Sequence, residues 1–180
     1  MAMLRVPYSS RDHVKGPARA PVTLLEYGDY QCPYCGQAYW ILKDIEDSQR
    51  NDVRFVFRHF PLTEIHPFAL LAAEAAEGAN AQGKFWDMHD MLYENQDALD
   101  LDSVLEYAAS LDLDADTIRA DIESHRHLPK IQEDFMGGVR SGVNGTPCFF
   151  INGVRHDGPW DAASLSRAIA SSQRDSAYAR

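Results

Sequence analysis

The stretch from Val22 to Cys35 reads VTLLEYGDYQCPYC and joins an apolar run to a CxxC pair. The part that ends at Tyr27 is short, apolar and rich in strand-forming residues, so it predicts a buried β-strand. Pro33 stands where the first turn of a helix tolerates proline. The sequence therefore predicts that Cys32 and its partner lie at a strand-to-helix junction.

The sequence on either side extends this junction into an α/β unit. Apolar residues recur at helical spacing after the CxxC pair through about Arg50, and Val53–Arg58 then alternates apolar and basic residues like a strand. A strand, a helix and a strand in so short a stretch predict parallel pairing. Near the end, Cys148–Ile151 is a further β run, Asn152-Gly153 is a hairpin signal and Asp161 is a good N-cap for a last helix.

The middle of the chain differs from its ends. Between about residues 62 and 140 the pattern predicts only helices, so we expect a helical segment inserted into the α/β unit. Residues 61–136 hold 17 acidic and 4 basic residues, whereas the remainder holds 10 acidic and 13 basic residues. This asymmetry is typical of two structural units, or of helices whose outer faces are solvated.

Composition narrows the class of protein. The chain has 180 residues, of which 45% are apolar, so we expect a folded core. Its net charge of −10 argues against a nucleic-acid partner. No apolar run approaches the roughly 20 residues that span a bilayer, so no membrane partner is expected. Charges such as Arg5, Arg11 and Lys15 interrupt the first 20 residues, which predicts a cytoplasmic location, or a periplasmic one if a signal peptide was removed.

The CxxC pair carries the candidate chemistry. At a helix N-terminus, unpaired N–H groups and the helix dipole favour an anion, so the pKa of Cys32 should fall below its ordinary value of about 8.5. Cys35, one turn later, would be the buried thiol that resolves a mixed disulfide. One alternative is that the pair supplies two of the four ligands of a zinc site. The third cysteine, Cys148, is far along the chain, however, and the histidines lack the spacing of a zinc knuckle. The other alternative is a buried pair of cysteines with no activity. We expect neither a metal nor a cofactor.

Glu26 lies six residues before Cys32, within the apolar strand. Burial raises the pKa of a carboxyl group, and such an acid could relay the proton of Cys35 during exchange. The alternative is a glutamate at a strand edge that faces water.

Thr146-Pro147 precedes the last β run. A cis peptide bond there would leave the Thr146 backbone free to pair with an extended substrate. Tyr34 is expected to be exposed between the cysteines, where it could contact that substrate. Strand alternation places Cys148 and Phe150 on one face of the sheet. We expect Cys148 to be a buried, inert thiol, with a third redox thiol as the alternative.

Taken together, these motifs resemble bacterial DsbA-like thiol oxidoreductases of the thioredoxin superfamily. The resemblance rests on five segments: Ala20–Cys35, Arg58–Leu62, His66-Pro67, Gln82–Trp86 and Gly145–Pro147. It implies an α/β thioredoxin fold with an inserted all-helical subdomain, divided as residues 12–61, 62–140 and 141–172.

The same resemblance implies a nucleophile at Cys32, a resolving thiol at Cys35, a buried acid at Glu26 and a cis-proline at Pro147. Two features depart from the best-known relatives, which are exported oxidants with a histidine between the cysteines. Here the dipeptide is Pro33-Tyr34, the pair that glutaredoxins use, and a thiol follows the proline at Cys148. Pro33 and Tyr34, with Thr146 and Pro147, are therefore the predicted substrate contacts.

We predict a thiol–disulfide oxidoreductase that acts on protein or small-molecule disulfides and receives electrons from a thiol or dithiol donor. In a reducing compartment it would run mostly as a reductase or isomerase. A glutathione-linked reductase is one alternative, suggested by the Cys32–Cys35 sequence alone. A redox-inert binding module or chaperone, with contacts made by the helical insertion, is the other.

Overall fold

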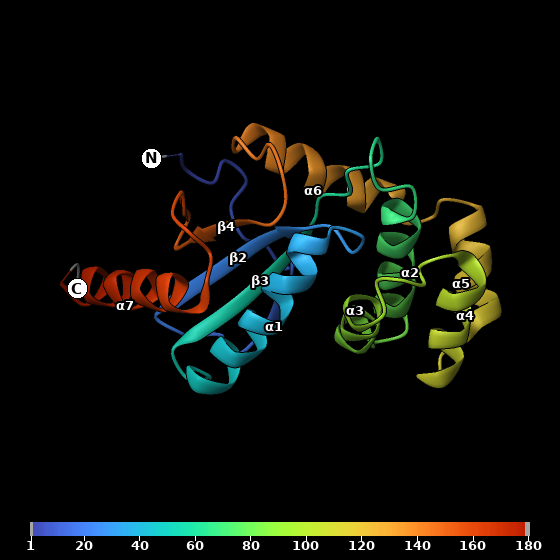
Figure 1. The fold of residues 1–180 in the computed structure, drawn as a ribbon, viewed down its shortest axis with the longest axis horizontal. Coiled ribbons are helices and arrows are strands. Elements are labelled where there is room, and N and C mark those ends of the chain that lie inside the picture. Colours follow the sequence, from blue (N-terminus) through green and yellow to red (C-terminus); the bar gives the residue numbers. More distant parts are fainter. Residues whose placement is uncertain (1, 179–180) are drawn as a thin grey trace.

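The structure is a computed structural model that describes residues 2–178 (Figure 1). The strands are β1 (His13–Lys15), β2 (Val22–Gly28), β3 (Val53–His59), β4 (Cys148–Ile151) and β5 (Val154–Arg155). The helices are α1 (Pro33–Ser48), α2 (Ala69–Ala81), α3 (Phe85–Glu94), α4 (Leu101–Ser110), α5 (Ala115–Glu123), α6 (Leu128–Arg140) and α7 (Ala162–Tyr178).

The strands form one sheet in the order β1-β3-β2-β4-β5. β2 and β3 run parallel, which confirms the predicted strand-helix-strand unit around α1. β4 pairs antiparallel with β2 and continues through the predicted hairpin at Asn152-Gly153 into β5. Asn152 and Gly153 both have positive φ, as a tight hairpin turn requires. β2 is buried along its whole length because it lies inside the sheet and both faces are covered.

Helices cover the sheet on both faces. α1 and α7 pack on one face in the larger core cluster, with Leu42, Leu165 and Ile169 among its buried residues. α6 covers the other face, where the ring of Phe135 stacks on that of Phe60 at a centroid distance of 4.3 Å. Figure 1 shows α6 and α7 on opposite sides of the strands. The alternating side chains of β2 and β4 thus divide between two apolar layers.

Helices α2 to α5 extend beyond the sheet but share the larger core cluster with it. The buried side of α2 is rich in alanine, which lets α3 and α5 approach it closely. α4 and α5 begin at Asp100 and Asp114, whose carboxylates accept the backbone N–H of Ser103 and Thr117 at 3.2 and 3.0 Å. Within residues 2–178, no helix combines the length and apolar character needed to cross a bilayer.

Candidate active site

The CxxC pair lies at the predicted strand-to-helix junction. β2 ends at Gly28, and Cys32 is the N-cap of α1, with φ −69° and ψ 120°. Pro33 occupies the first turn of the helix, where no backbone N–H is needed. Cys35 is fully buried one turn into the helix, whereas the Tyr34 side chain between them is exposed, as predicted. Cys32 therefore stands at the very start of the helix, although it too is only 3% exposed.

The pKa values of the two thiols are shifted in opposite directions. The pKa of Cys32 is lowered to about 5, first by a hydrogen bond from the Cys35 thiol and further by Thr146 and the backbone N–H groups of Tyr34 and Cys35. Burial raises the pKa of Cys35 well above its ordinary value, and the neighbouring Cys32 sulfur raises it further. At neutral pH Cys32 is thus a thiolate and Cys35 a thiol.

Glu26 is buried in β2, between Phe57 of β3 and Phe149 of β4 in the register of the sheet. The alternative of a glutamate facing water is therefore wrong. Burial raises the pKa of Glu26 to about 8, and the negative charges of Cys32 and Glu46 add to the shift. Its Oε1 atom has no hydrogen-bond partner among residues 2–178. Such a carboxyl group is poised to exchange a proton near neutral pH.

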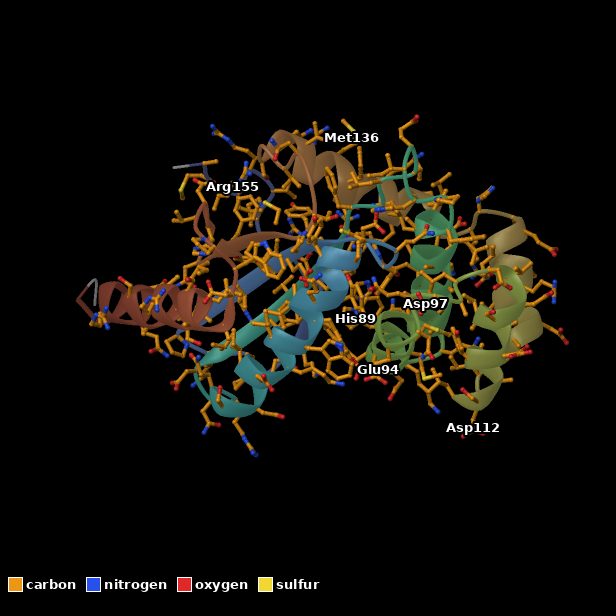
Figure 2. The ribbon with its side chains drawn as sticks, in the orientation of Figure 1. His89, Glu94, Asp97, Asp112, Met136 and Arg155 are labelled. Atoms are coloured by element: carbon orange, nitrogen blue, oxygen red, sulfur yellow. The ribbon has the colours of Figure 1, made fainter. Side chains whose placement is uncertain are left out.

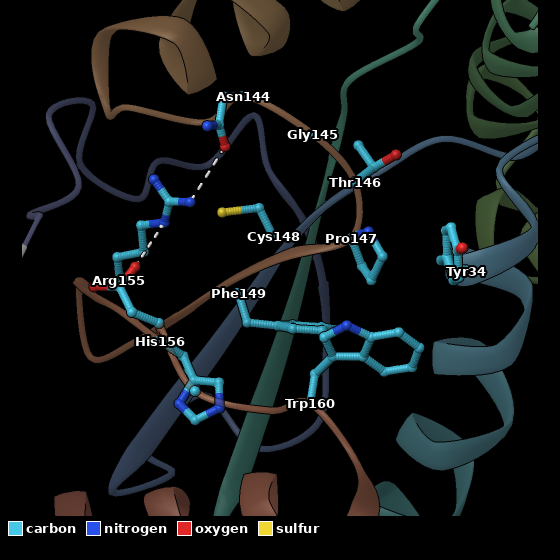
Figure 3. Close-up of a pocket in the computed structure, with 12 residues that line it drawn as sticks. Tyr34, Asn144, Gly145, Thr146, Pro147, Cys148, Phe149, Arg155, His156 and Trp160 are labelled. Atoms are coloured by element: carbon cyan, nitrogen blue, oxygen red, sulfur yellow. Dashed lines mark hydrogen bonds and ion pairs between the residues drawn. The ribbon is translucent and has the colours of Figure 1, made fainter. Parts of the chain in front are cut away.

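The loop before β4 faces the CxxC pair. Its Thr146–Pro147 peptide bond is cis, and the Thr146 carbonyl oxygen lies 3.4 Å from Cys32 Sγ, where it accepts a hydrogen bond when the thiol is protonated. A cavity of about 460 Å³ opens beside this contact, lined by Tyr34, Pro147, Phe149 and Trp160 among others (Figure 3). The predicted substrate contacts therefore come together around Cys32, with a partly apolar recess next to them.

Cys148 follows Pro147 but belongs to the other face of the sheet. It packs in the smaller core cluster with Phe150, as strand alternation predicts, whereas Cys32 and Cys35 belong to the larger cluster. In Figure 3 its sulfur points away from Pro147 and Tyr34. Burial raises the pKa of the Cys148 thiol, so little thiolate forms at neutral pH.

We therefore expect Cys148 to stay unreactive in the folded protein. Differential alkylation and mass spectrometry of the oxidised chain should show a single Cys32–Cys35 bridge. Cys148 should be labelled only after denaturation, because it is buried on the face of the sheet away from Cys32 and burial raises its pKa. A peptide that links Cys148 to either of the other cysteines after mild oxidation would contradict this prediction.

Two functional neighbours of the CxxC turn were not predicted from the sequence. The buried Asp29 carboxylate accepts the backbone N–H of Gln31 and of Leu62, each at 2.8 Å, and pairs with His66 Nδ1 at 2.7 Å. Gln96, from the loop after α3, donates its amide Nε2 to the carbonyls of Tyr30 at 2.7 Å and Cys32 at 2.9 Å. Neither carries a motif, because all of these partners except Gln31 lie far away in the sequence.

Side chains of α3 pack behind the turn that carries the CxxC pair. His89 of α3, labelled in Figure 2, is buried, and its Nδ1 lies 3.0 Å from the hydroxyl of Tyr30. The Tyr30 ring in turn packs on that of Tyr93 at a centroid distance of 4.8 Å. These contacts fix the turn that precedes Cys32 against α3.

The family described as Thioredoxin matches residues 9–171. The chain belongs to this family. Two curated relatives are longer proteins. A Na⁺/H⁺ antiporter NhaA 1 of Salinispora arenicola is 48% identical over 93% of this chain and 26% of that protein. A protein of the same name from Mycobacterium sp. (strain KMS) is 41% identical over 94% of this chain and 28% of that protein. The chain thus spans about a quarter of the length of these relatives.

Solved structures confirm the fold. Oxidised BdbD from Bacillus subtilis has a TM-score of 0.85, with 23% identity over 96% of this chain and 98% of that one. A thioredoxin-like oxidoreductase from Silicibacter pomeroyi has a TM-score of 0.82, with 28% identity over 92% and 94%. α-DsbA1 of Wolbachia pipientis has a TM-score of 0.83, with 22% identity over 97% and 96%. The predicted thioredoxin fold and the resemblance to DsbA-like proteins are therefore confirmed.

Proposed function

We propose that this chain is a thiol–disulfide oxidoreductase in which Cys32 is the nucleophile and Cys35 the resolving thiol. The observation that carries the proposal is the contrast between the two sulfurs. Both side chains are buried, but Cys32 stands at the N-terminus of α1 with a pKa of about 5, whereas the pKa of Cys35 is raised. Stepwise disulfide exchange needs one thiolate that attacks the substrate and a second thiol that stays protonated until the mixed disulfide has formed.

The exchange step assigns a role to Glu26. When the pair is oxidised, a substrate thiolate attacks Cys32 Sγ, a substrate–Cys32 disulfide forms and Cys35 leaves as a thiolate. With a pKa of about 8, Glu26 is mostly protonated at pH 7 and can supply the proton that Cys35 takes up. A second substrate thiolate then attacks the substrate sulfur of the mixed disulfide. The substrate leaves oxidised, and its two electrons remain on the Cys32–Cys35 dithiol.

The cis-proline loop is the proposed binding surface for the substrate chain. An extended peptide beside Thr146 could pair with its backbone as an added strand would. Pro33 and Tyr34 would contact the substrate from the helix side, and the recess next to Pro147 would take a neighbouring side chain. These contacts favour protein disulfides as the substrate class.

The proposed direction of exchange rests on the stability of the reduced pair. A thiolate held at a pKa of about 5 stabilises the dithiol form, so the disulfide form is the stronger oxidant. This favours donation of disulfides over the reductase or isomerase direction that the sequence predicts. The reductase or isomerase direction and the cytoplasmic location both stay predictions.

Two assays test the function. The chain should catalyse reduction of insulin by dithiothreitol, and its equilibrium with glutathione should give a reduction potential above the roughly −270 mV of thioredoxin. Insulin reduction no faster than with dithiothreitol alone would favour a redox-inert binding module. Selective turnover of glutathione mixed disulfides would favour a glutathione-linked reductase. A potential at or below that of thioredoxin would restore the reductase direction.

The division of the chain also bears on function. We propose that α2 to α5 form the helical insertion, whereas α6, within the predicted 62–140 segment, belongs to the sheet that it covers. The stack of Phe135 on Phe60 supports this boundary. The insertion reaches the active-site turn through Gln96, which donates to the carbonyls of Tyr30 and Cys32. A Cβ at Gly36 would collide with the Gln96 amide, so the two segments fit closely there.

We predict that Gln96→Glu raises the pKa of Cys32 and slows exchange. The new carboxylate has nearly the same shape, but it cannot donate to the two carbonyls and it adds negative charge beside the thiolate. The measurement is the ultraviolet absorbance of the thiolate as a function of pH. The matched control is Gln37→Glu on the exposed face of α1. Equal titration curves for the two variants would remove Gln96 from the site.

A further inference from the structure

Three buried side chains from separate elements meet away from the CxxC pair. His13 comes from β1, His59 from the end of β3 and Glu77 from α2. The Nε2 atoms of the two histidines lie 2.6 and 2.9 Å from Glu77 Oε1. Their side chains are only 6%, 1% and 4% exposed. The mechanism above uses none of the three.

Their donor atoms are arranged as a set of metal ligands. One nitrogen from each imidazole and one carboxylate oxygen all lie within 4.8 Å of one another. Two neutral imidazoles and one carboxylate are a common ligand set for zinc, whose bonds to such atoms are about 2.0–2.2 Å long. A tetrahedral ion would hold its ligand atoms roughly 3.3 Å apart. The present contacts at 2.6 and 2.9 Å would therefore need to open by about 0.7 and 0.4 Å.

The surroundings hold the ligands in place. The His13 ring stacks on Phe85 of α3 at a centroid distance of 3.5 Å and an interplanar angle of 6°. Glu77 sits on the buried face of α2, where a carboxylate needs positive charge or donors, and the two imidazoles are its hydrogen-bond partners in the present structure. A divalent cation would supply that charge at the point where β1, β3 and the helical insertion meet.

We propose that His13, His59 and Glu77 form a binding site for one divalent first-row transition metal of the zinc type. The sequence pattern predicts no metal, since only the fold brings these residues together. The ion would join the helical insertion to the sheet and would not take part in disulfide exchange. His59 Nδ1 has no hydrogen-bond partner among residues 2–178. Since an outer partner typically strengthens metal binding by 10–100-fold, we expect weaker binding than in closed structural zinc sites.

The test uses the full chain with the Cys32–Cys35 disulfide formed, so that these thiols cannot bind metal. Cobalt(II), added as a spectroscopic probe, should bind at one equivalent and give visible d–d bands without a sulfur-to-cobalt charge-transfer band. Zinc should displace the cobalt and raise the melting temperature, and EDTA should reverse the shift. Cobalt that binds only to the reduced protein, with a charge-transfer band, would overturn the proposal.

Variants locate the site. His13→Asn and Glu77→Gln should each lower the affinity for cobalt by at least tenfold. His125→Asn is the matched control, since it removes an exposed imidazole that pairs with Glu74 on another part of α2. Equal binding by the control and by His13→Asn would place the metal elsewhere.

If the variants do not fold, X-ray absorption spectroscopy of the wild-type zinc complex can still identify the ligands of the metal. Two imidazole ligands with nitrogen and oxygen donors are expected, and a spectrum without imidazole scattering would refute the site. Less than about 0.1 equivalents of bound metal in excess zinc would leave the three residues as a hydrogen-bonded His–Glu–His group.

Discussion

Cys32→Ser is expected to reduce disulfide exchange to the uncatalysed rate, a loss of several orders of magnitude. A serine hydroxyl at that position is not ionised at neutral pH and cannot form the mixed disulfide. Cys35→Ser should instead accumulate substrate disulfides through Cys32, because the attacking thiolate remains and the resolving thiol is gone. Insulin reduction measures the first effect, and non-reducing gels with mass spectrometry measure the second.

The pH dependence adds a second criterion to this prediction. With a pKa of about 5, the Cys32 thiolate is almost fully formed at pH 7, so attack by Cys32 should change little from pH 6 to 8. Below pH 5 the rate should fall about tenfold per unit as the thiolate is protonated. Cys148→Ser is the control and should exchange like the wild type. Turnover that survives in Cys35→Ser would mean that the two roles are assigned wrongly.

The parts of the site that the sequence predicts are those coded by neighbouring residues. A buried strand, a turn and a proline in the first helical turn place Cys32 without any long-range information. Glu26 follows from the same logic, since an acid inside an apolar central strand has no route to water. Even the face occupied by Cys148 follows from the two-residue period of a strand.

The contacts missed by the sequence pattern join residues far apart in the chain. Gln96 lies 64 residues from the Cys32 carbonyl that it binds, and Glu77 lies 64 residues from His13. No local period encodes such a meeting, because it depends on how the helical insertion packs. β1 was also not predicted, since three residues are too few to establish an alternating pattern. The resemblance to a known family supplied the cis-proline, because a proline before a strand is by itself ordinary turn chemistry.

Glu26→Gln is expected to make the folded protein more stable at neutral pH, although it should slow catalysis. The pKa of Glu26 is about 8 in the folded chain, against about 4.5 for an ordinary glutamate. Between these values the folded state binds one proton more than the unfolded state does. The free energy of unfolding therefore falls as pH rises, by about 1.4 kcal/mol per unit. At pH 7 this amounts to about 3 kcal/mol, which a neutral glutamine avoids.

Urea unfolding of the reduced proteins at several pH values measures this difference. The gain from Glu26→Gln should be near zero at pH 4.5, reach about 3 kcal/mol at pH 7 and stop growing above pH 8, where Glu26 is ionised in both states. Glu64→Gln, on the exposed loop after β3, is the control and should show no such trend. In insulin reduction, which runs this step in reverse, Cys35 must lose its proton before it can release the product, so the variant should release product more slowly and lose the inflection near pH 8. A constant stability difference together with an unchanged rate profile would mean that Glu26 is neither a titrating buried acid nor the proton relay for Cys35.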